Sequence, residues 1–252
     1  MYTKNEIINN IKNQINDVII LDETDSTNNY IKENINIIKP NTLVIAKKQS
    51  SGRGRRGRSF ISPEGGLYLS ILVDTNGNLN GSSYPTVATA VGVSRTLEEC
   101  YGLSCDIKWV NDIYIKNRKL CGILCETTTI KNRIIIGIGI NIITPKNGFA
   151  NEIANIATSL SEHIEVFNLS EFVAKLYDGI TAFAPEFDIK SIINEYRKKS
   201  CVIGKEIYVL KNDNFINARA VDITDSASLV VEYPDRTTET LFYGDISIKI
   251  NK

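Results

Sequence analysis

The stretch DIKWVNDIYIKNRKLCGILCE, residues 106–126, sets the architecture that we expect for this chain. Short apolar runs alternate in it with turns of Lys, Asn and Arg, and another apolar run covers residues 133–143. Runs of this length separated by polar turns predict an antiparallel meander. The hairpin places Lys119 at the start of a strand, from which its amine can reach into a pocket. A polar turn with a solvated lysine is the simpler alternative at this point.

Outward from the meander, apolar periodicity predicts both helices and strands. Residues 25–28 are typical of a helix N-cap, placed just before an apolar Tyr30-Ile31 pair. Helical spacing covers residues 5–16, 85–100 and 169–199, and buried strands are predicted at 18–21, 43–46 and 67–73. Together these elements predict an α+β fold built on a mixed, largely antiparallel sheet with helices.

The character of the sequence changes near residues 199–202. Beyond them, short alternating runs separated by turn residues cover 207–210, 217–223, 229–233 and 239–242. Such strands predict a small β-barrel of about 50 residues. We therefore expect two domains, residues 1–199 and residues 200–252.

Composition excludes several classes of protein. The chain has 252 residues, and 29 Lys and Arg balance 29 Asp and Glu, which argues against a dedicated nucleic-acid binder. The sequence predicts neither a membrane span nor a signal peptide, so we expect a cytoplasmic protein without a membrane partner. Five cysteines at irregular spacing and a single histidine predict reduced thiols and no metal held by the protein.

The loop KKQSSGRGRRGR, residues 47–58, carries six basic side chains and no acidic one. Its three glycines let the backbone approach a ligand closely, and its arginines offer forked donors to phosphate or carboxylate oxygens. Anion binding is the interpretation that we favour. A patch that contacts nucleic acid and a solvated basic surface are the alternatives. The spacing of a P-loop is missing.

Alternating glycines mark the run IGIGIN, residues 136–141. Glycine inside a strand indicates that a ligand or another backbone approaches closely. A tightly packed sheet explains the pattern equally well.

Taken together, these motifs resemble those of biotin–protein ligases, also called biotin–[acetyl-CoA-carboxylase] ligases. The resemblance extends from about residue 18 to residue 250. Its most specific parts are the arginine-glycine loop and the run Lys108-Trp109-x-Asn111-Asp112. It implies a class II synthetase-like catalytic domain followed by a small SH3-like β-barrel.

The resemblance implies an enzyme that works in two steps. Biotin would attack the α-phosphate of ATP, carried with Mg²⁺, to give biotinyl-5′-AMP and pyrophosphate. A lysine of a biotin carboxyl carrier protein or domain would then take the biotinyl group and release AMP. The arginine-glycine loop would close over the adenylate. The resemblance also allows a homodimer.

The family pattern assigns roles to residues of this sequence. Lys119, Arg55 and Asp112 would be catalytic, with Lys119 on the biotin carboxylate. Arg53 and Arg55 would contact phosphates, and Asn111 or Asp112 would be outer contacts of the ATP-bound Mg²⁺. The biotin and adenylate site would comprise Ser26, Thr27, Asn28, Gln49, Gly52, Arg53, Gly54, Arg55, Asn111, Lys119, Gly122 and Asn141. The flexible part of the loop would comprise Gly52, Arg56, Gly57 and Arg58.

The sequence departs from the family pattern in three places. Val110 stands where proline is usual, which removes no functional group. Only about 24 residues precede Asp25, too few for the helix-turn-helix domain of regulatory members, so we expect no DNA partner. The turn at residues 225–228 lacks the glycine expected there.

Other functions remain open at this point. A lipoate–protein ligase would share the fold but adenylate a different acid. A nucleic-acid-binding module would use Arg53 to Arg58. An inactive scaffold of the same fold is a third alternative, although every charged residue of the motifs is present.

Overall fold

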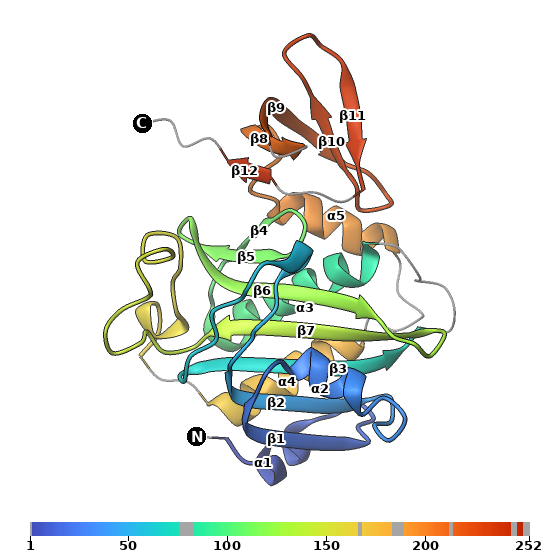
Figure 1. The fold of residues 1–252 in the computed structure, drawn as a ribbon, viewed down its shortest axis with the longest axis vertical. Helices are drawn as coiled ribbons and strands as arrows, with labels where there is room; N and C mark the ends of the chain where they lie inside the picture. Colours follow the sequence, from blue (N-terminus) through green and yellow to red (C-terminus); the bar gives the residue numbers. More distant parts are fainter. Residues whose placement is uncertain are drawn as a thin grey trace.

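The computed structural model describes residues 2–75, 83–165, 168–182, 189–211, 214–242 and 246–248. Its centre is a seven-stranded sheet with the order β1-β2-β3-β7-β6-β5-β4 (Figure 1). Only β1 and β2 pair in parallel, which confirms a mixed, largely antiparallel sheet. The strands are β1 Asp17–Thr24, β2 Thr42–Gln49, β3 Gly66–Asp74, β4 Asp106–Lys108, β5 Asp112–Ile115, β6 Arg118–Thr127 and β7 Arg133–Asn141.

The meander predicted from residues 106–143 is confirmed as the run from β4 to β7. Its tight turn between β5 and β6 places Lys116 and Asn117 at φ values of 48° and 63°. Two consecutive residues with positive φ are typical of the hairpin turn whose twist matches that of the strands. Lys119 consequently lies at the start of β6, as the sequence predicts.

Helices cover both faces of this sheet. Strand residues alternate between faces, so Leu43 and Ile45 pack into the larger core with α3 and α4, while Val44 packs into a smaller core with Ile31 of α2. The helices are α1 Lys4–Asn10, α2 Thr27–Glu33, α3 Tyr84–Tyr101, α4 Leu169–Thr181 and α5 Ile189–Lys199, with short 3₁₀ turns at Arg55–Gly57 and Leu160–Glu162. None of the helices in the described part of the chain has the length and apolar character needed to cross a membrane.

The first helix is shorter than the predicted 5–16. Thr3 and Glu6 form a capping box at its start, and it ends at Asn10. The backbone N–H groups of Lys12 and Asn13 donate to the Asp178 carboxylate of α4 at 3.0 and 2.9 Å. These contacts with α4 take the place of further helical hydrogen bonds. The predicted 169–199 helix is likewise two helices, and residues 183–188 between them lie outside the described residues.

Five strands between residues 206 and 248 form a second sheet, which is antiparallel with the order β11-β10-β9-β8-β12. Within the described residues β11 and β12 do not pair, so the sheet is open and the predicted closed barrel is not observed. The turn that lacks the expected glycine instead places Ala227 at φ 65°. Its strands are β8 Glu206–Lys211, β9 Asn214–Ile223, β10 Leu229–Glu232, β11 Thr238–Leu241 and β12 Ile246–Ile248.

The two sheets are joined at their facing ends. Trp109 Nε1 donates to the carbonyl of Ala227 at 3.0 Å, and Ile107 forms a parallel bridge with Ser200 just after α5. Trp109 is buried in this junction. The end of the meander is therefore held by the smaller sheet, immediately beside Asn111 and Asp112.

Candidate active site

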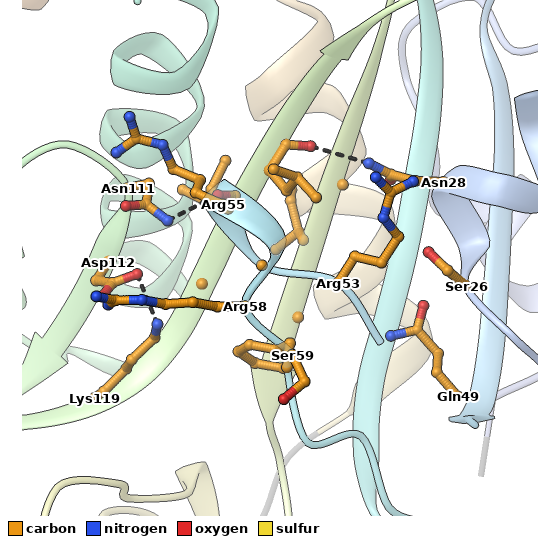
Figure 2. A pocket seen from close by; sticks show the side chains of 18 of the residues that line it. Ser26, Asn28, Gln49, Arg53, Arg55, Arg58, Ser59, Asn111, Asp112 and Lys119 are labelled. Carbon is orange, nitrogen blue, oxygen red and sulfur yellow. Dashed lines mark hydrogen bonds and ion pairs between the residues drawn. The ribbon is translucent and has the colours of Figure 1, made fainter. Parts of the chain in front are cut away.

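A pocket opens on the α2 face of the large sheet, between the start of α2, the hairpin of β5 and β6, and the loop after β2 (Figure 2). It holds about 900 Å³ of empty space, including its open mouth. Its lining comprises Ser26, Thr27, Asn28, Gln49, Arg53, Gly54, Arg55, Arg58, Ser59, Phe60, Lys108, Trp109, Asn111, Asp112, Lys119, Gly122, Ile123, Leu124, Gly137, Ile138, Gly139 and Ile246.

Glycines of two neighbouring strands form the floor of the pocket. Gly122 of β6 lies opposite Gly139 of β7 in the ladder, and Gly137 lies opposite Leu124. A Cβ atom at Gly139 would approach Phe60 Cε1 to 2.5 Å, and one at Gly137 would approach Asn28 Oδ1 to 2.2 Å. The glycines therefore make room for Phe60 and Asn28, so the alternating pattern marks a cavity floor.

One wall is polar and buried. Ser26, Thr27 and Asn28 at the start of α2 are each 3% exposed, although Ser26 makes no side-chain cap hydrogen bond. Gln49 Oε1 accepts from the backbone N–H of Thr27 at 2.9 Å, and Ser70 donates to Asn28 Oδ1 at 2.6 Å. Interlocked hydroxyl and amide groups of this kind are fixed in orientation, so they present defined donors and acceptors to a ligand.

The arginine loop, defined as residues 49–60, forms the opposite side of the pocket. It is folded by its own backbone: Gly54 N–H donates to the Arg58 carbonyl at 2.7 Å, and Phe60 N–H donates to the Gly52 carbonyl at 2.8 Å. A Cβ at Gly52 would lie 2.3 Å from the Phe60 carbonyl oxygen, so only glycine fits there. This fold brings Phe60 back over the glycine floor.

Arg53 and Lys119 lie toward opposite ends of the pocket (Figure 2). One terminal nitrogen of Arg53 donates to Asn29 Oδ1 at 2.7 Å, and the other lies 3.4 Å from Glu126 Oε1. Lys119 Nζ lies 2.7 Å from Asp112 Oδ1 and 5.6 Å from the centre of the Phe60 ring. An anion bound between these ends meets a cation at each side.

Lys108 adds a further cation to the Lys119 end. Burial lowers the pKa of Lys108, the Asp112 carboxylate opposes this shift, and the nearby Lys119 and Arg58 cations add to it. Asn111 beside it donates to the Ile123 carbonyl at 3.0 Å, which ties the strand entry to β6. The repulsion among these cations means that a bound anion would be stabilised here.

Asn141 stabilises the strand that carries Lys119 and does not line the pocket. Its side chain donates to the Thr158 carbonyl at 3.0 Å, while Thr158 N–H donates to the Lys119 carbonyl at 2.9 Å. Lys119 N–H in turn donates to the Ile156 carbonyl at 2.7 Å. Residues 156–158 thus hold the Lys119 backbone from one side, and Asn141 holds residues 156–158.

Most of the residues predicted from the sequence meet in the one pocket. Four do not line it: Gly52, Arg56, Gly57 and Asn141. Prediction missed Ser59, Phe60 and Ile246, for which the sequence gives no signal other than the aromatic residue at the end of the arginine loop. Gly137, Gly139, Lys108 and Trp109 lie in segments already singled out, although no role was assigned to them.

Chemically, the pocket is suited to polyanionic ligands. Its lining contains five cationic side chains and a single carboxylate, Asp112. The described part of the chain brings together no three His, Cys, Asp or Glu side chains able to hold a metal ion. Charge neutralisation by Arg and Lys, with buried polar groups for orientation, is therefore the chemistry that these residues offer.

Comparison with known families supports this interpretation. Residues 20–141, which contain α2, the arginine loop and β6 with Lys119, match the model of the Biotin/lipoate A/B protein ligase family. The matched segment of this chain is therefore similar to the ligase domain of that family. It includes both ends of the pocket and the glycine floor.

Curated relatives fall in the same group. The chain is 43% identical over 125 residues to the bifunctional ligase/repressor BirA of Bacillus subtilis, an alignment that covers 48% of this chain and 38% of that protein. The chain thus spans less than half of that relative. Over 229 residues it is 24% identical to the biotin–[acetyl-CoA-carboxylase] ligase of Paracoccus denitrificans, covering 85% of this chain and 94% of that protein.

Solved structures extend the likeness to both sheets. The biotin protein ligase of Aquifex aeolicus, solved in complex with biotin and ATP, superimposes with a TM-score of 0.78 and 27% identity. The match covers 93% of this chain and 99% of that one. The biotin protein ligase of Leishmania major, at 22% identity and a TM-score of 0.63, shares the fold.

Proposed function

We propose that this chain is an ATP-dependent biotin–protein ligase. It activates biotin as biotinyl-5′-AMP and transfers the biotinyl group to a lysine of a biotin carboxyl carrier protein or domain. The observation that carries the proposal is the pocket itself, in which a buried polar wall and a cationic end flank a glycine floor. The Aquifex relative solved with biotin and ATP supports the same ligands.

Biotin fits the polar wall by its chemistry. Its ureido group carries two N–H donors and a carbonyl acceptor, which match the hydroxyl and amide groups of Ser26, Thr27, Asn28 and Gln49. Its bent, largely apolar fused rings and aliphatic chain would lie between the polar wall and the cationic end of the pocket. The carboxylate at the end of that chain would then reach Lys119.

Lipoate fits this wall less well. Its dithiolane ring has no strong hydrogen-bond donor or acceptor, so it would form no hydrogen bonds with the buried groups at the start of α2. This difference is the physical reason for choosing biotin over lipoate within a family that contains ligases for both.

The first step joins two anions and needs charge neutralisation. A biotin carboxylate oxygen attacks the α-phosphorus of MgATP, the bond to the bridging oxygen breaks, and pyrophosphate leaves. Lys119 orients the carboxylate, while Arg53, Arg55 and the loop backbone stabilise the charge that develops on the phosphate. Asp112 holds the Lys119 ammonium at 2.7 Å and so fixes its position. Mg²⁺ would arrive on ATP, with Asn111 or Asp112 as outer contacts.

The second step uses the carrier lysine as nucleophile. Its neutral amine attacks the carbonyl carbon of the mixed anhydride, the bond to the phosphate oxygen breaks, and AMP leaves as the amide forms. Until then the anhydride must be kept from water. Closure of the arginine loop, at Gly52, Arg56, Gly57 and Arg58, would provide that protection.

Residues 1–199 would form the catalytic domain, and residues 200–252 would form an SH3-like domain. The protein would act in the cytoplasm, and the proposal allows a homodimer. Ile246 of β12 lines the pocket, which supports a part for the second sheet in enclosing the ligand.

The test first compares biotin with lipoate as the acid that is activated, and then asks whether a carrier domain is modified. The purified chain is given MgATP with biotin or with lipoate, and pyrophosphate release is followed. Biotin-dependent release followed by a mass gain on one lysine of a carrier domain is the expected result. Pyrophosphate release with lipoate but not with biotin would show that lipoate is the substrate. No pyrophosphate release with either acid would contradict the proposal.

A further inference from the structure

Glu126 lies at the end of β6, beyond Gly122 and Leu124 on the same face of the strand. Its side chain is only 16% exposed yet has three polar partners. Oε2 accepts from Asn28 Nδ2 at 2.8 Å, while Oε1 lies 2.6 Å from Lys32 Nζ and 3.4 Å from a terminal nitrogen of Arg53. None of the roles derived above uses this carboxylate.

The charge of Glu126 is preserved in spite of its burial. Burial raises its pKa, but the hydrogen bonds from Lys32 and Asn28, together with the Lys32 and Arg53 charges, outweigh that effect and hold the pKa below its usual value. The side chain is therefore an acceptor only. A group that only accepts dictates how its donors are oriented.

Two elements of the pocket meet at this carboxylate. Asn28 presents its amide nitrogen to Glu126 at 2.8 Å and to the Leu124 carbonyl at 3.2 Å, and its oxygen therefore faces Ser70. Arg53 belongs to the arginine loop, and its guanidinium also contacts Asn29 of α2. One side chain on β6 thus joins the start of the polar wall to the loop that is proposed to cover the adenylate.

We propose that Glu126 is a positioning residue of this pocket. It docks the arginine loop against α2 through Arg53, and it sets the orientation of the Asn28 carboxamide. The docking role concerns the ligand-free protein. The kinetic consequence rests on the proposed ligase function.

Replacing the carboxylate with an amide separates this role from simple packing. Gln has nearly the volume of Glu but only one acceptor oxygen. If that oxygen faces Asn28, the amide nitrogen faces the two cations; if it faces the cations, two donors meet at Asn28. Glu126→Gln therefore cannot accept from Asn28 and from the two cations at the same time, whereas the Glu126 carboxylate does.

The docking role is tested by limited trypsin digestion of the ligand-free protein, with cleavage after Arg55, Arg56 and Arg58 followed by mass spectrometry. We expect Glu126→Gln to be cut there at least five times faster than wild type. Cleavage at the wild-type rate would overturn the docking role. Should Glu126→Gln not fold, Arg53→Gln breaks the same pair from a side chain that is 43% exposed and is expected to have the same effect.

Two controls make the comparison specific. Lys32→Met also removes a charge partner of Glu126 but leaves Arg53 as its remaining cation, so the loop is expected to be cut no faster than in wild type. Glu171→Gln removes an exposed carboxylate that pairs with Lys175 on α4, far from the loop in sequence, and is expected to change nothing. Faster loop cleavage in either control would contradict a specific role for the Arg53 contact.

The kinetic readout addresses Asn28. In Glu126→Gln we expect the KM for biotin to rise about tenfold, a larger change than the change in kcat for pyrophosphate release, because Asn28 belongs to the polar wall that is proposed to bind biotin. An unchanged KM would overturn the Asn28 part of the proposal. Absence of any pyrophosphate release in wild type would instead contradict the ligase function, and the digestion experiment would still decide the docking role.

Discussion

Lys119 Nζ lies 2.7 Å from Asp112 Oδ1, across the hairpin that joins β5 to β6, and both side chains are mostly buried. Asp112 thus supplies the local counter-charge while the cations Lys108 and Arg58 lie close by. The pair fixes the lysine at the cationic end of the pocket. It also leaves Lys119 as the group best placed to meet a carboxylate at the end of a ligand.

Lys119→Ala is expected to lower adenylate synthesis by about a hundredfold or more, the scale of losing one charged group that stabilises a transition state. Without Lys119, the Asp112 carboxylate would also repel the incoming anion. Pyrophosphate release at saturating MgATP measures the effect. Lys116→Ala, at the exposed tip of the same hairpin, is the matched control, and a near-normal rate in Lys119→Ala would remove the lysine from its role.

Arg55→Gly is expected to weaken retention of the adenylate more than its formation. The change removes a cation from the pocket lining and adds backbone freedom to the loop proposed to close over the intermediate. We expect the rate of adenylate release to rise about tenfold or more, measured by transfer of preformed biotinyl-5′-AMP from a gel-filtered complex. A release rate equal to that of wild type would contradict this role.

Gly137→Ala is expected to damage the polar wall from below. The added Cβ would lie 2.2 Å from Asn28 Oδ1, so the carboxamide must move away from Ser70. Overpacking of this kind costs roughly 1–3 kcal/mol of stability, and we expect the KM for biotin to rise severalfold.

Ile134→Val is the matched control for Gly137→Ala, because both residues lie on β7. Ile134 packs into the core on the other face of β7, so its truncation is expected to cost about 0.5–1.5 kcal/mol without changing the KM for biotin. Equal KM values in Gly137→Ala and Ile134→Val would show that the wall does not depend on Gly137.

His163 is expected to make the folding stability of the chain weakly dependent on pH. Burial lowers its pKa, the Lys116 and Arg118 charges add to this, and Glu162 opposes it. The unfolded chain therefore binds a proton more readily, so stability is full above about pH 7.5 and falls as pH decreases through the ordinary histidine range near 6.5. Urea denaturation between pH 5 and 8 should show this decrease in wild type and a smaller one in His163→Gln; identical pH profiles would contradict it.

The local elements of the fold could be predicted because they depend on short-range patterns. Apolar alternation and the polar turns predicted β4 to β7, and an N-cap cluster predicted α2. The end of α1 depends instead on Asp178, far along the chain, which no local pattern indicates. Closure of the second sheet likewise depends on strand pairing, and sequence alone could not show that β11 and β12 stay apart among the described residues.

The site shows the same division. The charged and glycine-rich loop predicted Arg53, and the hairpin predicted Lys119, because their chemistry is apparent in the sequence. The role of Asn111 followed only from the resemblance to biotin–protein ligases. Phe60 was missed because its place over Gly139 follows from how the arginine loop folds back. Asn141 was predicted to line the pocket and does not, whereas no role was predicted for Glu126, which contacts Asn28 and Arg53. In both cases the fold decides which partner a polar side chain meets.

The most direct test of the central claim is to incubate the purified chain with biotin and MgATP, without any carrier, and to look for the acyl-adenylate by mass spectrometry. Lipoate in place of biotin, and Lys119→Ala in place of wild type, complete the set. We expect biotinyl-5′-AMP with wild type and biotin, little with lipoate, and almost none with Lys119→Ala. Lipoyl-AMP as the main product would contradict the choice of substrate, and the absence of adenylate from either acid would contradict the assignment of the pocket as a ligase site.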